Sequence, residues 1–248
     1  MDKKDKKRLD VLILEKNPQL SRRYIQEQLI AKGNVFVDGK IILKPGKLFD
    51  IDSKIDVNLN EPKYVSRAGY KLEKALDHFD LDVTDFVVLD GGVSTGGFSD
   101  CLLQRGVNRI YGIDVGYGQL ADKLKKDKRL ILMEKTNLRD LDKLPESVDL
   151  ITLDLSFISS LKVVPNLIKF LKMDGKIIIL IKPQFESEPE DIKKGGVIKD
   201  EKVHNRLIKK VQDGIEELGF LCRGVIESPI RGATSENKEF LAMFDKIK

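Results

Sequence analysis

Cysteine and histidine are scarce in this 248-residue sequence, which contains two of each. Cys101 and Cys222 are too few for a disulfide framework, and no group of cysteines and histidines has the spacing of a zinc site. With only His78 and His204 available, the sequence also argues against catalysis or metal binding by histidine. These shortages exclude disulfide-rich secreted proteins and zinc modules.

Long hydrophobic runs are also missing. No apolar segment approaches the ~20 residues that cross a bilayer, and the lysine-rich start lacks the apolar stretch of a signal peptide. Hydrophobic residues make up 41% of the chain and charged residues 34%, with only 8 prolines, as is typical of a soluble globular protein. We therefore expect a cytoplasmic protein with one ordinary domain and a small one.

Positive charge is concentrated in the first quarter of the chain. Residues 1–60 contain 13 Lys and Arg against 9 Asp and Glu, whereas the remainder contains 31 of each kind. A solubilising tail accounts for the opening MDKKDKKR, but not for the basic residues that follow it. Those residues favour a module that binds a polyanion. The candidate RNA-binding residues are Arg8, Arg22, Arg23, Lys32, Lys40, Lys44 and Lys47.

Residues 8–58 have the pattern of a compact unit of helix and strand. Ser21 is a plausible N-cap for a helix, because apolar residues at helical spacing follow it. The next segment predicts a hairpin, since alternating apolar residues flank the strong turn Asp38-Gly39. Residues 53–59 supply one more short strand. Basic residues lie on the helix start and the hairpin, so one face can hold several phosphates.

Beyond a linker expected at residues 60–67, apolar strands alternate with amphipathic helices. This alternation predicts an α/β fold with a mostly parallel sheet that is covered on both faces. Ligands of such sheets bind at the carboxyl ends of the strands, so we expect chemistry there. The expected strands are 86–90, 109–114, 129–133, 149–154, 176–182, 219–226 and 239–245, and the expected helices lie near 68–79, 97–105, 119–126, 161–172 and 202–218.

The first strand of this sheet ends in the segment VVLDGGVSTGGFSD. Asp90 is followed by a turn that contains Gly92, Gly96 and Gly97, and a helix starts near Phe98. The spacing is not that of the dinucleotide fingerprint G-x-G-x-x-G. An acidic strand end before a glycine-rich turn fits a cationic ligand without phosphate, such as S-adenosylmethionine, although such a turn can also be purely structural.

The next two strand ends carry residues that suit a nucleoside. Asp114 ends the second strand, where a carboxylate reaches the two ribose hydroxyls of a nucleoside cofactor. Thr136 and Asn137 follow the third strand, in a position to touch an adenine edge. One acidic strand end alone is often an ordinary helix cap, but the succession favours a cofactor site.

The fourth and fifth strands end in opposite charges, Asp154 and Lys182. Adjacent strand ends bring these two side chains into one crevice, either as a structural ion pair or as reacting groups. A lysine is costly at the rim of a dry core unless something uses it, which makes Lys182 a candidate for chemistry. Lys71 on the entering helix and Glu239 at the last strand are further candidates, although each alone can be a solvated charge.

Together these residues resemble a known family. The segments YVSRAGYKLEKAL, LDGGVSTGGFSDCLLQRG, DVGYGQLADKL, LDLSFIS, LIKPQFE and GGVIKDEKVH are similar to motifs of the TlyA (hemolysin A) family, and the likeness runs over nearly the whole chain. It implies an RNA-binding domain of the ribosomal small-subunit protein four type at residues 1–59. It also implies, at residues 68–248, an FtsJ-like methyltransferase with a Rossmann-like class I fold and a seven-stranded sheet.

The resemblance also implies the site. Its catalytic tetrad falls on Lys71, Asp154, Lys182 and Glu239. The residues that it implies for S-adenosylmethionine are Asp90, Gly92, Ser94, Thr95, Gly96, Gly97, Phe98, Asp114, Asn137 and Asp154. The last motif departs from the family's G-x-x-G-N-x-E, because GATSENKEF lacks the second glycine and is one residue longer before Asn237. The register of Glu239 is therefore decided by the structure rather than by the motif.

The implied reaction is methylation of the ribose 2'-oxygen of cytidine in ribosomal RNA of the large subunit, with the small subunit as a further candidate. A ribose hydroxyl is a poor nucleophile, so positioning supplies much of the rate. We hypothesise that Lys182 accepts its proton or stabilises the alkoxide, that Asp154 and Lys71 orient Lys182, and that Glu239 holds Lys71 or the ribose. No metal is required, because a sulfonium is already activated.

Two other classes of function compete with this hypothesis. The family name records hemolytic activity, so a membrane-active protein is one rival, but the sequence has no apolar run or secretion signal that favours it. A non-catalytic RNA-binding protein on a methyltransferase fold is the other rival. The presence of Lys71, Asp154 and Lys182 counts against this second rival.

Overall fold

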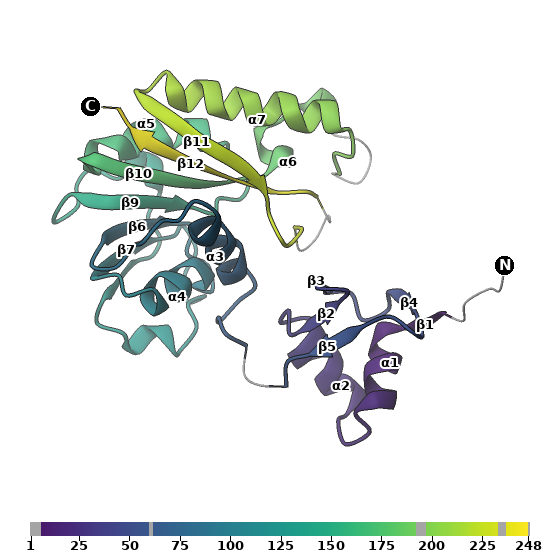
Figure 1. The fold of residues 1–248 in the computed structure, drawn as a ribbon. Helices are drawn as coiled ribbons and strands as arrows, with labels where there is room; N and C mark the ends of the chain where they lie inside the picture. The colour runs from purple at the N-terminus through teal and green to yellow at the C-terminus, as the bar shows by residue number, and fades with distance from the viewer. Residues whose placement is uncertain (1–5, 60–61, 192–196, 233–236, 248) are drawn as a thin grey trace. The chain divides into compact units, whose positions relative to one another are not determined.

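The computed structural model describes residues 6–59, 62–191, 197–232 and 237–247, and the chain divides into two compact units, Met1–Arg67 and Ala68–Lys248 (Figure 1). The first residues of the basic tail and of the expected linker lie outside the described residues. Within the linker, residues 62–67 form no helix or strand, although Tyr64 is buried.

The first unit combines helices with two small sheets. The helical segments are α1 (Leu9–Lys16), α2 (Arg22–Tyr24) and the π-helix η1 (Ile25–Ile30). The strands are β1 (Lys6–Arg8), β2 (Val35–Val37), β3 (Lys40–Ile41), β4 (Leu48–Asp50) and β5 (Ile55–Val57). Strand β1 pairs with β4, and β2 lies between β3 and β5. Apolar residues from both helical segments and from β2 form one core.

Local signals in this unit identify its second helix and its hairpin. The hydroxyl of Ser21 accepts a hydrogen bond from the Tyr24 N–H at 3.1 Å, which is the expected N-cap. Asp38 and Gly39 have φ values of +50° and +75° and connect β2 to β3, as expected of a two-residue hairpin turn. Helix α1 was not predicted, because its run of neighbouring apolar residues has little helical periodicity.

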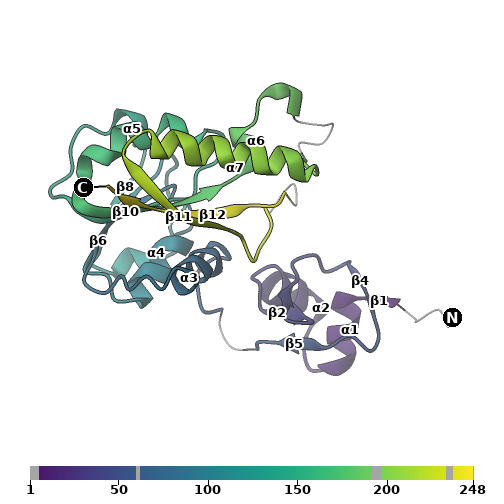
Figure 2. The same cartoon turned by 45° about the horizontal axis from the view of Figure 1, so that its top comes forward.

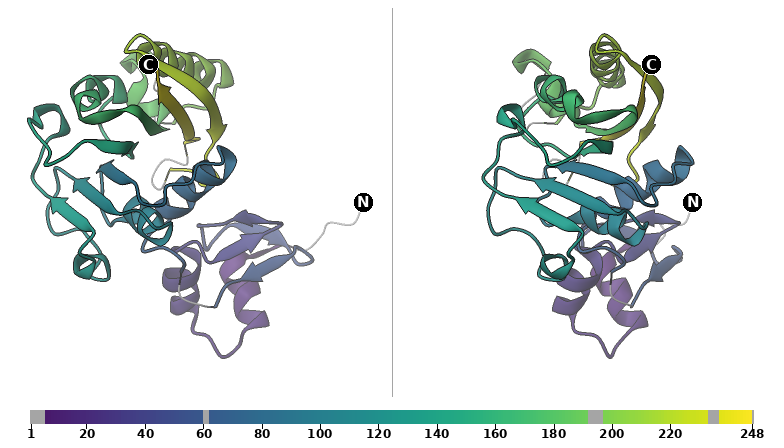
Figure 3. Two further views of the ribbon diagram at one scale, coloured as in Figure 1. Left: turned by 60° about the vertical axis from the view of Figure 1, so that its left-hand side comes forward. Right: turned by 90° about the vertical axis from the view of Figure 1, so that its left-hand side faces the viewer.

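The second unit contains a seven-stranded, mostly parallel sheet, so the predicted fold class is confirmed. Its strand order is β11-β12-β10-β9-β6-β7-β8, and β12 is antiparallel to both neighbours. The strands are β6 (Val87–Gly91), β7 (Arg109–Ile113), β8 (Leu130–Met133), β9 (Val148–Leu153), β10 (Leu171–Ile181), β11 (Phe220–Glu227) and β12 (Phe240–Lys246). The strands fan out with a marked twist (Figure 3).

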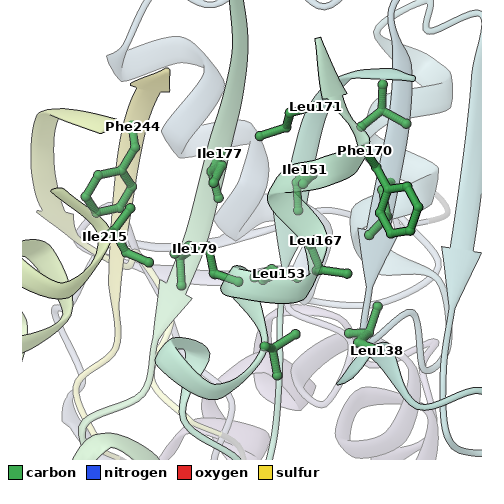
Figure 4. Packing of buried hydrophobic residues seen from close by; sticks show 14 of the residues in the cluster. Leu138, Ile151, Leu153, Leu167, Phe170, Leu171, Ile177, Ile179, Ile215 and Phe244 are labelled. Atoms are coloured by element: carbon green, nitrogen blue, oxygen red, sulfur yellow. The ribbon is translucent and has the colours of Figure 1, made fainter. Parts of the chain in front are cut away.

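Helices cover both faces of this sheet, which explains why most residues of its central strands are apolar and buried. On one face α3 (Ala68–His78) packs against α4 (Gly97–Gln104). Helices α5 (Val164–Leu167) and α7 (Glu201–Glu216) cover the other face, and α7 runs alongside β11 and β12 (Figure 2). The core under α5 and α7 includes Ile177, Ile179 and Leu167 (Figure 4).

Two expected helices of this unit are not formed as predicted. Near 119–126 the structure has a single 3-10 turn, η2 (Leu124–Lys126). The Ala121 N–H donates to the Thr95 carbonyl instead of to a carbonyl of its own segment, and Leu120 and Leu124 pack against Gly96. Tertiary contacts have therefore replaced the helix.

The expected helix at 161–172 is a series of short turns, η4 (Ser160–Lys162), α5 and η5 (Ile168–Phe170). Pro165 lies at the start of α5, where it has no N–H to donate to a preceding turn. Strand β10 also begins at Leu171 rather than at 176, with a register irregularity between Leu171 and Lys176.

Candidate functional site

A pocket of about 470 Å³ lies at the carboxyl ends of β6, β7, β8 and β9. Its volume is within the range of small-molecule sites. Five of the expected cofactor-binding residues line it, namely Gly92, Ser94, Asp114, Asn137 and Asp154. The location is the one that the parallel-sheet rule indicates.

Gly92 joins the end of β6 to the end of β9. The Asp154 N–H donates to the Gly91 carbonyl at 3.0 Å, and Gly92 has a φ of +83°. A Cβ atom at Gly92 would lie 2.5 Å from the Asp154 carbonyl oxygen. Only glycine fits here without displacing the backbone that carries Asp154.

Asp114 connects the glycine-rich turn to the loop after β7. One of its carboxylate oxygens accepts a hydrogen bond from the Ser94 N–H and the other accepts one from the Gly116 N–H, each at 2.7 Å. Ser94 itself has a φ of +49°, so this turn is held in a left-handed conformation. The carboxylate thus fixes two loops of the pocket and also lies in its wall.

Asn137 and Arg139 form the part of the pocket after β8. The side-chain oxygen of Asn137 accepts a hydrogen bond from the Arg139 N–H at 3.0 Å and caps the 3-10 turn η3 (Leu138–Asp140). Asn137 therefore has a local structural role in addition to its place in the pocket. Thr136, the other residue expected near an adenine, also lines the pocket.

Asp90 does not line the pocket. It is fully buried in β6, where its carboxylate accepts hydrogen bonds from the Ser99 hydroxyl at 2.6 Å and the Thr152 hydroxyl at 2.8 Å. Burial raises its pKa to about 6, and the nearby carboxylates of Asp154 and Asp114 add to the rise. The hydrogen bonds from the two hydroxyls lower the pKa and so offset part of this rise. Asp90 supports the pocket floor from within the sheet.

Four other expected cofactor residues, Thr95, Gly96, Gly97 and Phe98, also lie outside the pocket lining. Gly96 has a φ of +94°, and a Cβ there would lie 2.3 Å from Leu124. The glycine is thus required by packing against the loop after β7. Phe98 is buried in α4, which turns its ring away from solvent.

The four tetrad residues form two ion pairs. The Lys182 ammonium lies 2.6 Å from the Asp154 carboxylate and donates a hydrogen bond to the Ser156 hydroxyl at 3.0 Å. The Lys71 ammonium lies 2.5 Å from the Glu239 carboxylate, and both side chains are buried. Asp154 is the residue shared by the first pair and the pocket.

Strand order explains how these residues come together. Asp154 follows β9 and Lys182 follows β10, which are parallel neighbours. Strand β12 runs antiparallel to β10 with Ile181 opposite Phe240, so the residue before β12, Glu239, lies beside the end of β10. Helix α3 contacts β12 and carries Lys71.

The structure adds pocket residues that the sequence reasoning missed. Leu155, Ser156 and Phe157 form the wall that follows Asp154. The Phe157 side chain is 90% exposed, its φ is +67°, and its ring centroid lies 5.1 Å from that of Phe185. The sequence signal for this wall was its position directly after a predicted strand end.

All seven candidate RNA-binding residues of the first unit are exposed, but several are held by other groups. Arg8 and Arg22 both donate to the buried Asp10 carboxylate, and Arg23 pairs with Glu27. Lys47 lies over the Phe49 ring. Lys32, Lys40 and Lys44 are the other three exposed candidates.

Comparison with known proteins places this site in a family. The model of the FtsJ-like methyltransferase family matches residues 64–246, and the model of the S4 domain matches residues 7–54. The chain belongs to the FtsJ-like methyltransferase family. The predicted resemblance is thereby confirmed.

Relatives of this FtsJ-like chain extend over most of its length. Hemolysin A of Brachyspira hyodysenteriae is 41% identical over 96% of this chain and 99% of its own length. The 16S/23S rRNA (cytidine-2'-O)-methyltransferase TlyA of Mycobacterium tuberculosis is 38% identical over 94% of this chain and 88% of its own length. A solved structure of a candidate hemolysin from Streptococcus thermophilus is 35% identical, with a TM-score of 0.74, and covers 99% of this chain and 90% of that one.

Two further observations concern the predicted absences. Within the part of the chain that the structure describes, no helix has the length and apolar character needed to cross a membrane. Among the same residues no group of three or more His, Cys, Asp and Glu side chains is arranged to hold a metal ion.

Proposed function

We propose that this protein is an S-adenosylmethionine-dependent methyltransferase that acts on the ribose 2'-oxygen of cytidine in ribosomal RNA. The observation that carries the proposal is the place of Asp154, which lines the nucleoside-sized pocket and also pairs with Lys182. A methyl donor in the pocket and a reacting hydroxyl at Lys182 would then be neighbours. The relatives named as cytidine-2'-O-methyltransferases support the choice of substrate.

The pocket residues fit S-adenosylmethionine. Gly92 leaves room at the turn, and Asp114 and Asp154 supply carboxylates for ribose hydroxyls and a cationic ligand. Among the described lining residues Arg139 is the sole arginine or lysine, which suits a ligand without phosphates. When bound, this cofactor supplies a methyl group that its sulfonium has already activated.

The ion pairs define what the chain itself does. Lys182 is held between Asp154 and Ser156, so its ammonium group has a fixed position beside the pocket. There the ammonium stabilises the alkoxide that develops on the ribose oxygen, and the neutral amine form of Lys182 is the form that can take the hydroxyl proton. The buried pair of Lys71 and Glu239, beside the end of β10, would orient Lys182 and the ribose for in-line attack.

The first unit supplies the RNA specificity in this proposal. Ribose carries little base information, so substrate choice depends on RNA shape and phosphate contacts elsewhere. The exposed basic residues from Arg8 to Lys47 and the S4 match support this division of labour. A ribosomal RNA substrate also implies a cytoplasmic location. We propose domain limits of 1–59 and 68–248, with residues 60–67 as the linker.

The test is methyl transfer from tritiated S-adenosylmethionine to unmodified large and small ribosomal subunits, each incubated separately, followed by mapping of the labelled nucleotide. Label on a cytidine 2'-oxygen that Lys182→Ala abolishes is the expected result. Lys176→Ala is the matched control, because Lys176 lies in β10, the strand that precedes Lys182, and pairs with Asp245 of β12 away from the pocket. Cofactor binding without label on either subunit would overturn the ribosomal substrate, and no cofactor binding would leave a non-catalytic RNA-binding protein.

A further inference from the structure

Glu186 is a buried carboxylate that neither ion pair of the candidate site contains. It ends α6 (Pro183–Glu186), the short helix that starts directly after Lys182, and its exposed fraction is 4%. Its carboxylate accepts hydrogen bonds from the Ser160 N–H at 2.9 Å and the Ser160 hydroxyl at 2.8 Å, and also from the Ser159 hydroxyl.

These bonds satisfy a charge that would otherwise be expensive to bury. Among the described residues no lysine or arginine forms an ion pair with the Glu186 carboxylate. The nearby Lys210 ammonium donates instead to the backbone carbonyl of Glu186 and pairs with the Glu188 side chain. A buried carboxylate without a cation depends on its hydrogen bonds. All three come from one short loop, so the carboxylate fixes the position of that loop.

The loop held by Glu186 is the wall of the pocket. It runs from Asp154, through Ser156 and Phe157, to Ser159 and Ser160. Its start carries Asp154, the ion-pair partner of the Lys182 ammonium, and Ser156, whose hydroxyl accepts a hydrogen bond from it.

Glu186 therefore closes a ring. The chain leads from Lys182 through α6 to Glu186, hydrogen bonds lead to Ser160, the loop leads back to Asp154, and the ion pair returns to Lys182. A small cavity of about 10 Å³, lined in part by Lys182, Ser160 and Glu186, lies against this ring. The ring has few internal degrees of freedom, so losing the Glu186 contacts would release the loop at the reacting end.

We propose that Glu186 is a positioning residue for methyl transfer, which holds the Asp154–Ser160 loop so that Asp154 and Ser156 fix the Lys182 ammonium. The proposal rests on the proposed function of this site. Glu186 touches neither the pocket nor the ammonium, so it acts through the loop. A displacement of about 1 Å at a reacting group can cost 10²-fold in rate.

The kinetic test compares Glu186→Ala and Glu186→Gln with wild type and with Glu188→Ala. Glu188 is the matched control, because it is an exposed neighbour that pairs with Lys210 outside the ring. We expect kcat to fall at least tenfold in E186A and less in E186Q, which keeps one acceptor oxygen. The Kd of S-adenosylmethionine should rise by a smaller factor than the factor by which kcat falls, because the loop supplies one wall of the pocket while Gly92, Asp114 and Asn137 on its other sides are untouched. Thermal unfolding establishes the folded fraction of each variant.

A second measurement does not depend on turnover. The chain contains no tryptophan, so Phe157→Trp places a single fluorophore on the loop. We expect the fluorescence anisotropy of this fluorophore to be lower in F157W/E186A than in F157W or F157W/E188A, because an exposed side chain reports the motion of the loop that carries it. Equal anisotropy in all three variants would show that Glu186 does not hold the loop.

The two measurements separate the possible failures. If wild-type protein transfers no methyl group to ribosomal RNA, the proposed function fails, and the anisotropy comparison still decides whether Glu186 fixes the loop. If E186A keeps kcat within twofold of wild type, the positioning role is overturned even where the loop loosens. A kcat loss that parallels only the unfolded fraction would likewise reduce Glu186 to a stabilising residue.

Discussion

The Lys71 ammonium lies 2.5 Å from the Glu239 carboxylate, although 168 positions separate the two residues in the sequence. The side chains are only 10% and 3% exposed, so each charge depends on the other for its stabilisation. Because β12 is antiparallel to β10, the amino-terminal end of β12 lies at the carboxyl edge of the parallel strands, next to Lys182. The pair is thus a direct consequence of how the last strand is inserted.

Removal of one member of this pair should destabilise the protein. Glu239→Ala leaves the Lys71 ammonium buried and uncompensated, which we expect to cost about 3–5 kcal/mol in the free energy of unfolding. The double variant Lys71→Met, Glu239→Leu replaces the pair by apolar groups and should recover most of that stability. Urea unfolding measures both effects.

The same variants separate stability from chemistry. We expect E239A and the double variant to transfer methyl groups at least tenfold more slowly than wild type when rates are corrected for folded protein. Recovery of activity in the double variant would show that the pair serves only the fold. Lys176→Ala, which breaks the half-buried pair with Asp245 midway along β10, should change stability by no more than about 1 kcal/mol.

Much of this arrangement follows from local sequence signals, and part of it does not. The strands were predictable because buried parallel strands are continuous apolar runs, and Asp114, Asp154 and Lys182 stand directly at their ends. The partner of Lys71 was not fixed by any motif, because Glu239 reaches it only through the strand order β12-β10-β9. Strand order is a property of the whole sheet.

Local signals failed where tertiary contacts replaced local ones. The segment 119–126 has helical spacing, but its Leu120 and Leu124 side chains pack against the glycine-rich turn, where Gly96 has no side chain. The segment therefore forms only one 3-10 turn. The role of Asp10 could not be predicted from the sequence, because no local pattern indicates that Arg8 and Arg22 both donate to its carboxylate. Such residues become visible only when burial is known.

Asp90 should make stability depend on pH. Its pKa in the folded protein is about 6, above the ordinary value of 3.8, so the folded protein binds a proton more tightly than the unfolded chain. Its unfavourable contribution is therefore absent below about pH 4, grows as the pH rises towards 6, and is constant above that.

Asp90→Asn tests this expectation. At pH 8 it removes the buried charge, and the Ser99 and Thr152 hydroxyls can reorient to the amide, so we expect the free energy of unfolding to rise by about 1–3 kcal/mol. The difference from wild type should shrink towards pH 4. Urea unfolding at pH 4.5, 6 and 8 measures it, and a difference that is constant across this range would contradict the raised pKa.

Asp10 should promote RNA binding although it is acidic. Its buried carboxylate accepts hydrogen bonds from Arg8 and Arg22 at 3.0 Å, and these contacts, with Arg8 foremost, hold its pKa well below the usual range. Both guanidinium groups remain about half exposed, so Asp10 fixes their orientation towards a phosphate.

The variant Asp10→Asn removes a negative charge and so raises the net charge of the first unit by one. We nevertheless expect about a tenfold loss of affinity for ribosomal RNA and a shallower salt dependence. Glu27→Gln is the control, because it removes an acid from an exposed pair with Arg23 and should leave affinity equal or higher. Filter binding at several salt concentrations measures both, and circular dichroism verifies folding. Tighter binding by D10N, as by E27Q, would mean that net charge alone governs the interaction.

Gly92 should be required for cofactor binding for two reasons, its left-handed backbone conformation and the lack of space for a Cβ atom beside Asp154. Alanine at this position would place a Cβ 2.5 Å from the Asp154 carbonyl oxygen, with φ at +83°. Gly118→Ala imposes a similar strain at φ +71°, but nothing lies within 4 Å of its Cβ. Both variants carry the cost of about 1–2 kcal/mol for a left-handed residue, so only the displacement of Asp154 distinguishes them.

We expect calorimetry to give at least a tenfold loss of S-adenosylmethionine affinity in G92A and less than threefold in G118A. Equal losses would assign the effect to backbone strain, because the clash with the Asp154 backbone exists in G92A alone.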